Sequence, residues 1–120
     1  PGLLVRFDPE QLRQVLTNLV GNGLPYSIKH SGRAWVHLEA GRLDPIALPY
    51  VDVIDCGPGV PTDERHHLFE PFFTTESQGT GLGLYLSREI CEANQSRLDY
   101  IPSSQGACFR ITFAHPDRLM

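Results

Sequence analysis

Two asparagines near the N-terminal end of the chain have a spacing that could do chemistry. Asn18 and Asn22 stand four positions apart, which in a helix places both amides on one face. Amide oxygens can ligate a hard cation such as Mg²⁺ and leave coordination places for phosphate oxygens and water. A polar helix edge would give the same pattern, and asparagine is a mediocre helix former. The pair alone therefore leaves both interpretations open.

An acidic residue stands where a hydrophobic stretch ends in glycines. Asp55 begins the run Asp-Cys-Gly-Pro-Gly, so a strand before it would deliver the carboxylate at the edge of a sheet. Such a carboxylate can accept a hydrogen bond from an exocyclic amine such as that of adenine. Gly57 and Gly59 would let the backbone approach a ligand closely. A plain turn after a strand has the same composition, so the motif is not specific by itself.

A glycine-rich segment, Gly-Thr-Gly-Leu-Gly-Leu, runs from Gly79 to Leu84 and leads into a predicted helix. The N-terminus of a helix presents free backbone N–H groups and the positive end of its dipole to phosphate. The spacing differs from a dinucleotide-binding fingerprint, and Lys29, the only lysine, follows no glycine loop, which excludes a Walker P-loop. A hinge for a mobile loop over 72–81 is the alternative, and both can hold together.

Aromatic residues precede that loop in the run Phe69-Glu-Pro-Phe72-Phe73. An ordinary loop would expose all three rings, so we expect them to pack on the core. Anchored aromatics could then hold one end of a loop whose other end, at the glycines, swings over a ligand.

The elements that must position these residues follow from the spacing of apolar side chains. A first helix begins at Asp8 and Pro9, which supply a cap and a first-turn proline. Its apolar stripe comprises Leu12, Val15, Leu16, Leu19 and Val20. A short helix is predicted at 62–69 and a second long helix at 81–94. The stripe of that long helix comprises Leu82, Leu86, Ile90 and Ala93.

Alternation of apolar and polar residues predicts the strands. These are expected at 33–40, 50–55, 97–101 and 108–113, with a connection at 41–49. In the first strand Val36 and Leu38 should face the core, and in the last Phe109, Ile111 and Phe113 should. Helices on one face of a mostly antiparallel sheet make an α/β sandwich.

The composition fits a single compact domain over residues 1–120. A chain of 120 residues with 41% hydrophobic content suffices for one core. The formal net charge of −4 gives no footprint for nucleic acid or an acidic membrane. The three cysteines are far apart, which predicts buried thiols rather than disulfides or a zinc site. Because the chain starts without methionine, we expect a segment excised from a longer protein.

The order of these motifs along residues 5–114 resembles the ATP-binding domain of sensor histidine kinases, within the superfamily of gyrase, Hsp90 and MutL ATPases. The segment Asn18 to Asn22 resembles the N box, Asp55 to Gly59 the G1 box, Phe69 to Phe72 the F box, and Gly79 to Gly83 the G2 box. The F box favours histidine kinases, because the other ATPases lack it. The residue sequence of this F box is similar to that of the nitrogen-regulatory branch of histidine kinases. The run Tyr85-Leu-Ser-Arg-Glu is similar to kinases that govern type IV pilus genes.

The resemblance implies a Bergerat fold, a mixed and mostly antiparallel sheet of about five strands with three helices on one face and a mobile ATP lid. It implies that Asn22 ligates Mg²⁺, that Asn18 lies at the phosphates of ATP, that Tyr26 lies against the adenine, and that Asp55 accepts its amino group. The remaining nucleotide-binding positions implied are Gly57, Gly59, Phe69, Phe72, Gly79, Thr80, Gly81, Leu82 and Gly83.

The implied activity is transfer of the γ-phosphoryl group to a histidine on a separate dimerisation domain, from which a response regulator would receive it. None of the five histidines of this chain has the sequence context of that acceptor. We therefore expect a monomeric catalytic domain that transfers little on its own, in the cytoplasmic part of a membrane-bound sensor, without nucleic acid or direct membrane contact.

Two positions depart from the family pattern. Pro25 stands where many relatives have a basic residue that reaches the phosphates, and Glu76 follows Thr-Thr where lysine is common. A proline inside a helix costs about 3 kcal/mol, so the first helix should kink or end near Gly23. We expect weaker nucleotide binding than in a relative with a basic residue at that position. The alternatives are a nucleotide-binding or partner-docking module with weakened catalysis, or another ATPase or anti-sigma-factor serine kinase of the superfamily.

Overall fold

The computed structural model describes residues 5–32, 36–46, 48–55, 62–71, 83–102 and 106–114, and of residues 22–31 only the path of the helical backbone. The elements in chain order are helix α1 (Pro9–Ser31), strands β1 (Val36–Leu43) and β2 (Leu48–Asp55), the 3₁₀ helix η1 (Thr62–His67), helix α2 (Gly83–Ala93), and strands β3 (Arg97–Ile101) and β4 (Cys108–Thr112). No helix among these residues is both long and apolar enough to cross a membrane.

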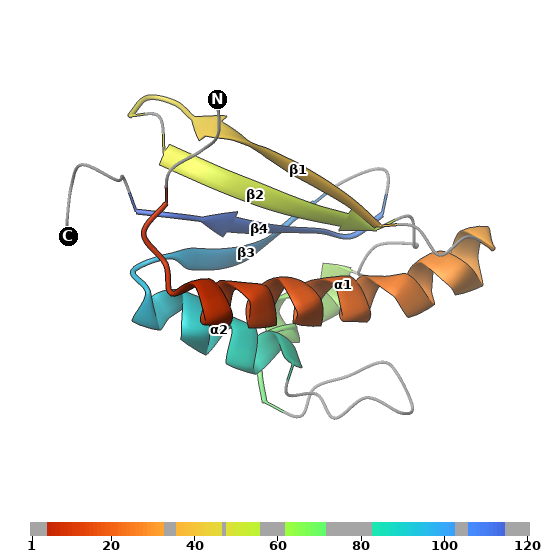
Figure 1. The fold of residues 1–120 in the computed structure, drawn as a ribbon. Coiled ribbons are helices and arrows are strands. Elements are labelled where there is room, and N and C mark those ends of the chain that lie inside the picture. The colour runs from red at the N-terminus through yellow and green to blue at the C-terminus, as the bar shows by residue number, and fades with distance from the viewer. Residues whose placement is uncertain are drawn as a thin grey trace.

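The four strands form one sheet in the order β1-β2-β4-β3, and every neighbouring pair is antiparallel. Helices α1 and α2 lie together on one face of this sheet (Figure 1). The predicted α/β sandwich is therefore confirmed. The described part of the chain holds four strands rather than about five, and it contains no parallel pair.

The core lies between the helices and the sheet face that they cover. Val15 and Leu19 of α1 are 0% and 1% exposed, as their place in the predicted stripe requires. Phe109 and Ile111 of β4 meet them from the sheet and are equally buried. The predicted alternation of the last strand is thus confirmed, because Phe113 is buried as well.

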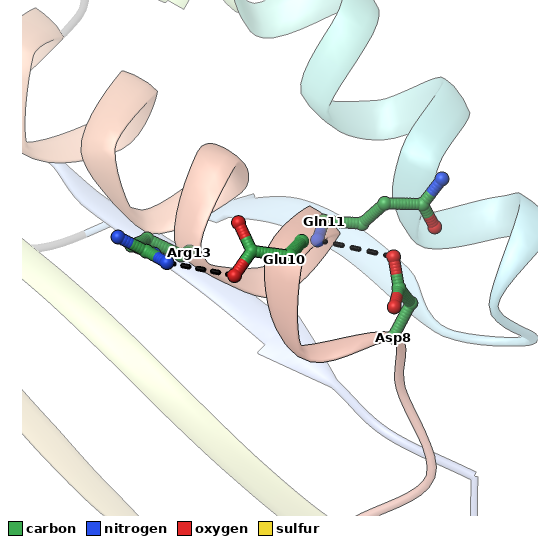
Figure 2. A network of polar contacts seen from close by, with 4 residues as sticks. All are labelled: Asp8, Glu10, Gln11 and Arg13. Atoms are coloured by element: carbon green, nitrogen blue, oxygen red, sulfur yellow. Dashed lines mark hydrogen bonds and ion pairs between the residues drawn. The ribbon is translucent and has the colours of Figure 1, made fainter.

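Helix α1 begins as the sequence indicates (Figure 2). The Oδ2 atom of Asp8 accepts a hydrogen bond of 3.3 Å from the backbone N–H of Gln11, and the Asp8 carbonyl accepts one of 2.8 Å from Leu12. Such a cap contributes about 1 kcal/mol, because it satisfies N–H groups that have no partner within the helix. Glu10 and Arg13 form an exposed ion pair of 2.7 Å on the next turn, which adds little.

The expected end of α1 near Gly23 is wrong, since the helix continues through Pro25 to Ser31. Pro25 has no N–H to donate to the carbonyl of Gly21, four residues earlier. Gly21 is exposed, so water can bind that carbonyl instead. The loss of this one hydrogen bond on the solvent side therefore does not end the helix.

The predicted stripe of α2 is wrong in part. Leu86 is 42% exposed and Ala93 is exposed, whereas Ser87 and Cys91 are fully buried. Ser87 meets Asn18 of α1 on this face, so the packing of α2 in the fold, and not the spacing of its largest apolar residues, decides which face is buried. The helix ends with the backbone N–H groups of Gln95 and Ser96 donating to the carbonyls of Glu92 and Cys91, a Schellman motif with Gln95 at φ 60° where glycine is usual.

The first strand also differs from its prediction. Strand β1 runs to Leu43, three residues past the expected end, and a short turn at 44–46 replaces most of the expected connection. Leu38 is 50% exposed rather than buried, because β1 is an edge strand of the described sheet and α1 packs mainly on β2 (Figure 1). The predicted short helix forms as η1, a 3₁₀ helix rather than an α-helix.

Candidate nucleotide site

Asp55 ends strand β2 and is held in place by the start of β4. Its side chain is buried, with the residue 3% exposed. The backbone N–H of Ala107 donates a hydrogen bond of 3.0 Å to the Oδ1 atom of Asp55, and the backbone N–H of Asp55 donates one of 3.0 Å to the Ala107 carbonyl. The carboxylate is thus fixed by a backbone group. Sequence gave no signal for Ala107, because any residue except proline carries that donor.

Asn18 lies on the face of α1 that meets α2. It is half-buried, and its Nδ2 atom donates a hydrogen bond of 3.3 Å to the Oγ atom of Ser87. Sequence analysis did not select Ser87, although a serine one turn before Cys91 would have been a signal for a close helix contact. Asn22 follows one turn later in α1. The side chains of Asn22 and Tyr26 lie outside the described residues, so their predicted roles stay predictions.

Phe69 is packed between the sheet and α2. Its ring meets Phe109 edge to face at 6.2 Å between centroids, and the guanidinium of Arg88 lies 4.7 Å from the centre of the Phe69 ring. Phe109 also meets Tyr100 of β3 at 5.5 Å. This is the packing expected of an aromatic anchor. Arg88, which stacks on that anchor from α2, was missed because a charged residue on a helix usually indicates a solvent-exposed face.

Of the G2-box residues Gly79 to Gly83, the structure describes only Gly83, which begins α2 and is exposed. The other predicted positions of the motifs lie outside the described residues, namely Gly57, Gly59, Phe72, Gly79, Thr80, Gly81 and Leu82. Gly83 and Ser87 stand one turn apart on α2, and α1 packs against both α2 and β2. The elements that carry Asn18, Asp55 and Gly83 are therefore neighbours in the fold.

The described cysteines are buried thiols that hold their protons tightly. Burial, and after it the charge of Glu92, raises the pKa of Cys91 to about 12. Cys91 and Cys108 are both free and buried, in agreement with the predicted thiols, and Cys56 lies outside the described residues. Within the described part of the chain no three His, Cys, Asp or Glu side chains are grouped to hold a metal ion.

Residues 7–117 match the family model described as histidine kinase-, DNA gyrase B-, and HSP90-like ATPase. The chain therefore belongs to this family of ATPases. Over 115 residues, 95% of the chain, it is 62% identical to "Sensor protein kinase PilS" of Pseudomonas aeruginosa, of which it covers 22%. It is 33% identical to "Nitrogen regulation protein NtrY" of Azorhizobium caulinodans over 93% of the chain and 15% of that relative. Both similarities noted in the sequence are thus confirmed.

Solved structures agree with this assignment. The catalytic domain of histidine kinase ThkA superposes with a TM-score of 0.71 at 30% identity, over 91% of this chain and 69% of that one. Full-length ShkA in complex with AMPPNP superposes with a TM-score of 0.67 at 32% identity, over 86% of this chain and 21% of that one. The chain spans only about a fifth of the length of the curated relatives that it matches.

Proposed function

We propose that this chain binds Mg-ATP and donates the γ-phosphoryl group of ATP to a histidine on the dimerisation domain of a two-component sensor kinase. The observation that carries the proposal is the buried carboxylate of Asp55, fixed by Ala107 at the end of β2, in a chain whose family match spans residues 7–117. The 62% identity to a sensor protein kinase and the likeness to an AMPPNP complex support it further.

Asp55 is the residue assigned to the base of the nucleotide. A carboxylate that is held in one orientation and shielded from water can accept a hydrogen bond from the exocyclic amine of adenine. A guanine carries a carbonyl oxygen at the corresponding position, which would face the carboxylate with two acceptors and no donor. The proposal therefore includes selection of adenine over guanine.

Asn18 and Asn22 are the residues assigned to the phosphates and to Mg²⁺. The amide nitrogen of Asn18 is used by Ser87, which leaves the amide oxygen as the atom suited to a hard cation or to its bound water. Together with the lack of a carboxylate cluster among the described residues, this donor set fits a cation that is held largely by phosphate oxygens. The cation would neutralise charge on the phosphates.

The chain must also orient the nucleotide so that a histidine of another domain can attack the γ-phosphorus. In the transfer step a nitrogen of the acceptor histidine forms a bond to the γ-phosphorus as the bond to the bridging oxygen breaks, and ADP leaves with that electron pair. We assign the acceptor to the dimerisation domain of the same kinase and the next transfer to a response regulator. We also assign the chain to the cytoplasmic part of a membrane-bound sensor, as the resemblance to sensor kinases implies.

The test supplies a histidine-bearing dimerisation domain in trans with γ-labelled ATP and Mg²⁺. We expect acid-labile label on the dimerisation domain when this chain is present, and none with an Asp55→Ala variant. Binding of ATP without any transfer would favour the second candidate, a nucleotide-binding or docking module, for which Pro25 within α1 is the specific observation. A lack of ATP binding by the unmodified chain would contradict the proposal outright.

A further inference from the structure

Ser87 is a fully buried polar residue at the contact between the two helices. Its exposed fraction is 0%, and Val15 and Leu19 of α1 and Cys91 of α2, which belong to the hydrophobic core, are at most 1% exposed. A hydroxyl in such surroundings is costly unless it is hydrogen-bonded. Its recorded partner is the amide of Asn18 across the helix interface, at 3.3 Å. An alanine would fill the same space without the cost of burying a hydroxyl. Packing alone therefore does not explain why a serine stands here.

The direction of the hydrogen bond fixes the orientation of the amide. A primary amide has donors only on its nitrogen and accepts only at its oxygen. Because Nδ2 of Asn18 donates to Ser87, the Oδ1 atom is turned away from α2. Without the hydroxyl, the two ends of the amide differ little in size, and the side chain could rotate to exchange them.

The helices are already joined elsewhere, which separates Ser87 from a purely structural role. At the other end of the interface, Asn94 accepts a hydrogen bond of 3.0 Å from the Asp8 backbone N–H and donates one of 2.8 Å to Gln11. Val15 and Leu19 of α1 and Cys91 of α2 also belong to one buried hydrophobic core, and the two helices are in contact with each other. The packing of α1 on α2 therefore does not depend on the pair of Ser87 and Asn18.

We propose that Ser87 is a positioning residue for the nucleotide phosphates, which holds the amide of Asn18 with its oxygen available to Mg²⁺ and its bound water. This inference rests on the proposed function, because it assigns Ser87 a part in the same site. The positioning role makes two predictions. Loss of the hydroxyl must weaken binding of the triphosphate but not of the nucleoside, and it must act only through Asn18.

The experiment measures binding of Mg-AMPPNP by calorimetry and of adenosine by NMR titration, with the whole chain and with variants Ser87→Ala, Asn18→Ala and the double variant. Losing one hydrogen bond should weaken Mg-AMPPNP binding by about three- to tenfold in Ser87→Ala. Adenosine binding should be unchanged. In the Asn18→Ala background, Ser87→Ala should have no further effect, because the partner is already gone.

A matched control is available at Ser96, which is 3% exposed and donates its hydroxyl to the carbonyl of Asn94 at the far end of α2. Ser96→Ala makes the same chemical change and should leave Mg-AMPPNP affinity unchanged. Ser87→Cys, which keeps the volume but has only a weakly hydrogen-bonding thiol, should repeat the loss seen in Ser87→Ala. It thereby keeps the test valid if Ser87→Ala does not fold.

The outcomes separate the two proposals. Equal losses of Mg-AMPPNP affinity in the wild-type and Asn18→Ala backgrounds, a parallel loss for adenosine, or an equal loss in Ser96→Ala would overturn the positioning role and leave the proposed function standing. A wild-type chain that binds no nucleotide would instead contradict the proposed function itself.

Discussion

Two buried aspartates in strand β2 differ in the kind of group that donates hydrogen bonds to their carboxylates. Asp52 and Asp55 are 6% and 3% exposed and stand three residues apart, so the alternation of the strand turns them to opposite faces. Asp52 lies on the face without α1 and α2, where Arg110 of β4 donates to both of its oxygens at 2.7 and 3.0 Å. Asp55 lies on the helix side and is held by the backbone N–H of Ala107.

The difference shows that burial alone does not mark a functional carboxylate. The guanidinium of Arg110 also lies 4.6 Å from the centre of the Tyr50 ring, so Asp52 belongs to a side-chain cluster that fastens β2 to β4. This bidentate pair uses both carboxylate oxygens of Asp52 for hydrogen bonds within the protein. For Asp55 a backbone N–H donates to the Oδ1 atom and orients the carboxylate, so this aspartate is positioned by the main chain rather than by a cationic side chain.

The largest expected effect is on stability at Asp52. An Asp52→Ala variant should lower the free energy of unfolding by about 2–3 kcal/mol, because it leaves the partly buried guanidinium of Arg110 without its partner. Urea unfolding followed by circular dichroism measures this. The matched control is Asp99→Ala, whose partner Arg97 is 78% exposed at 3.7 Å, and a loss below about 1 kcal/mol is expected there. Equal losses in both variants would break the comparison.

The next effect concerns Asp55 and the nucleotide. Asp55→Asn keeps a carbonyl oxygen for the N–H of Ala107 but replaces the charge, so Mg-AMPPNP affinity should fall by about ten- to a hundredfold with little change in stability. Calorimetric titration measures the affinity. Asp52→Asn serves as the control, and we expect its nucleotide affinity to equal that of the wild type. If Asp52→Asn lost as much affinity as Asp55→Asn, the assignment of roles would be wrong.

A smaller effect is expected at Pro25, on the nucleotide side of the comparison. Pro25→Arg supplies a cation of the kind that the family resemblance implies at this position, and it should raise nucleotide affinity by about two- to fivefold at low salt. The gain should shrink as ionic strength rises. Pro25→Ala repairs the helix in the same way without adding charge, so it isolates the contribution of the cation. Unchanged affinity in Pro25→Arg would refute the idea that a missing cation weakens binding.

Sequence predicted the parts of this fold that depend on neighbours along the chain. The cap at Asp8, the stripe of Val15 and Leu19, and the alternation of β4 are local patterns. The contacts that define the site join residues 52 and 69 positions apart, from Asp55 to Ala107 and from Asn18 to Ser87. They depend on strand register and on which face of α2 meets α1. That face was not predicted, because the large apolar side chain of Leu86 indicated a different one. Asp52 was missed for the same reason, because its partner Arg110 lies 58 positions away in the sequence.

The effect that is smallest at neutral pH, and that grows only above pH 9, is a pH dependence that reports on the Asp52 side of the sheet. Burial, followed by the charge of Asp52, raises the pKa of the Cys108 thiol from its ordinary 9.0 to about 11. The folded protein therefore holds this proton more tightly than the unfolded chain does. The stability that the neutral thiol contributes is complete below pH 9 and is lost as the pH rises from 9 towards 11.

Comparison of the wild type with Cys108→Ala isolates this contribution, because Cys91 is common to both. The difference between their free energies of unfolding should be constant below pH 9, and above it the wild type should lose stability relative to the variant. In Asp52→Asn the thiolate of Cys108, followed by its absorbance near 240 nm, should form at lower pH, because one cause of the raised pKa is removed. The same substitution at Asp55 should leave that titration in place, since Asp55 is not among the groups that shift Cys108. An equal shift in both variants would mean that the two carboxylates are not electrostatically separated by the sheet.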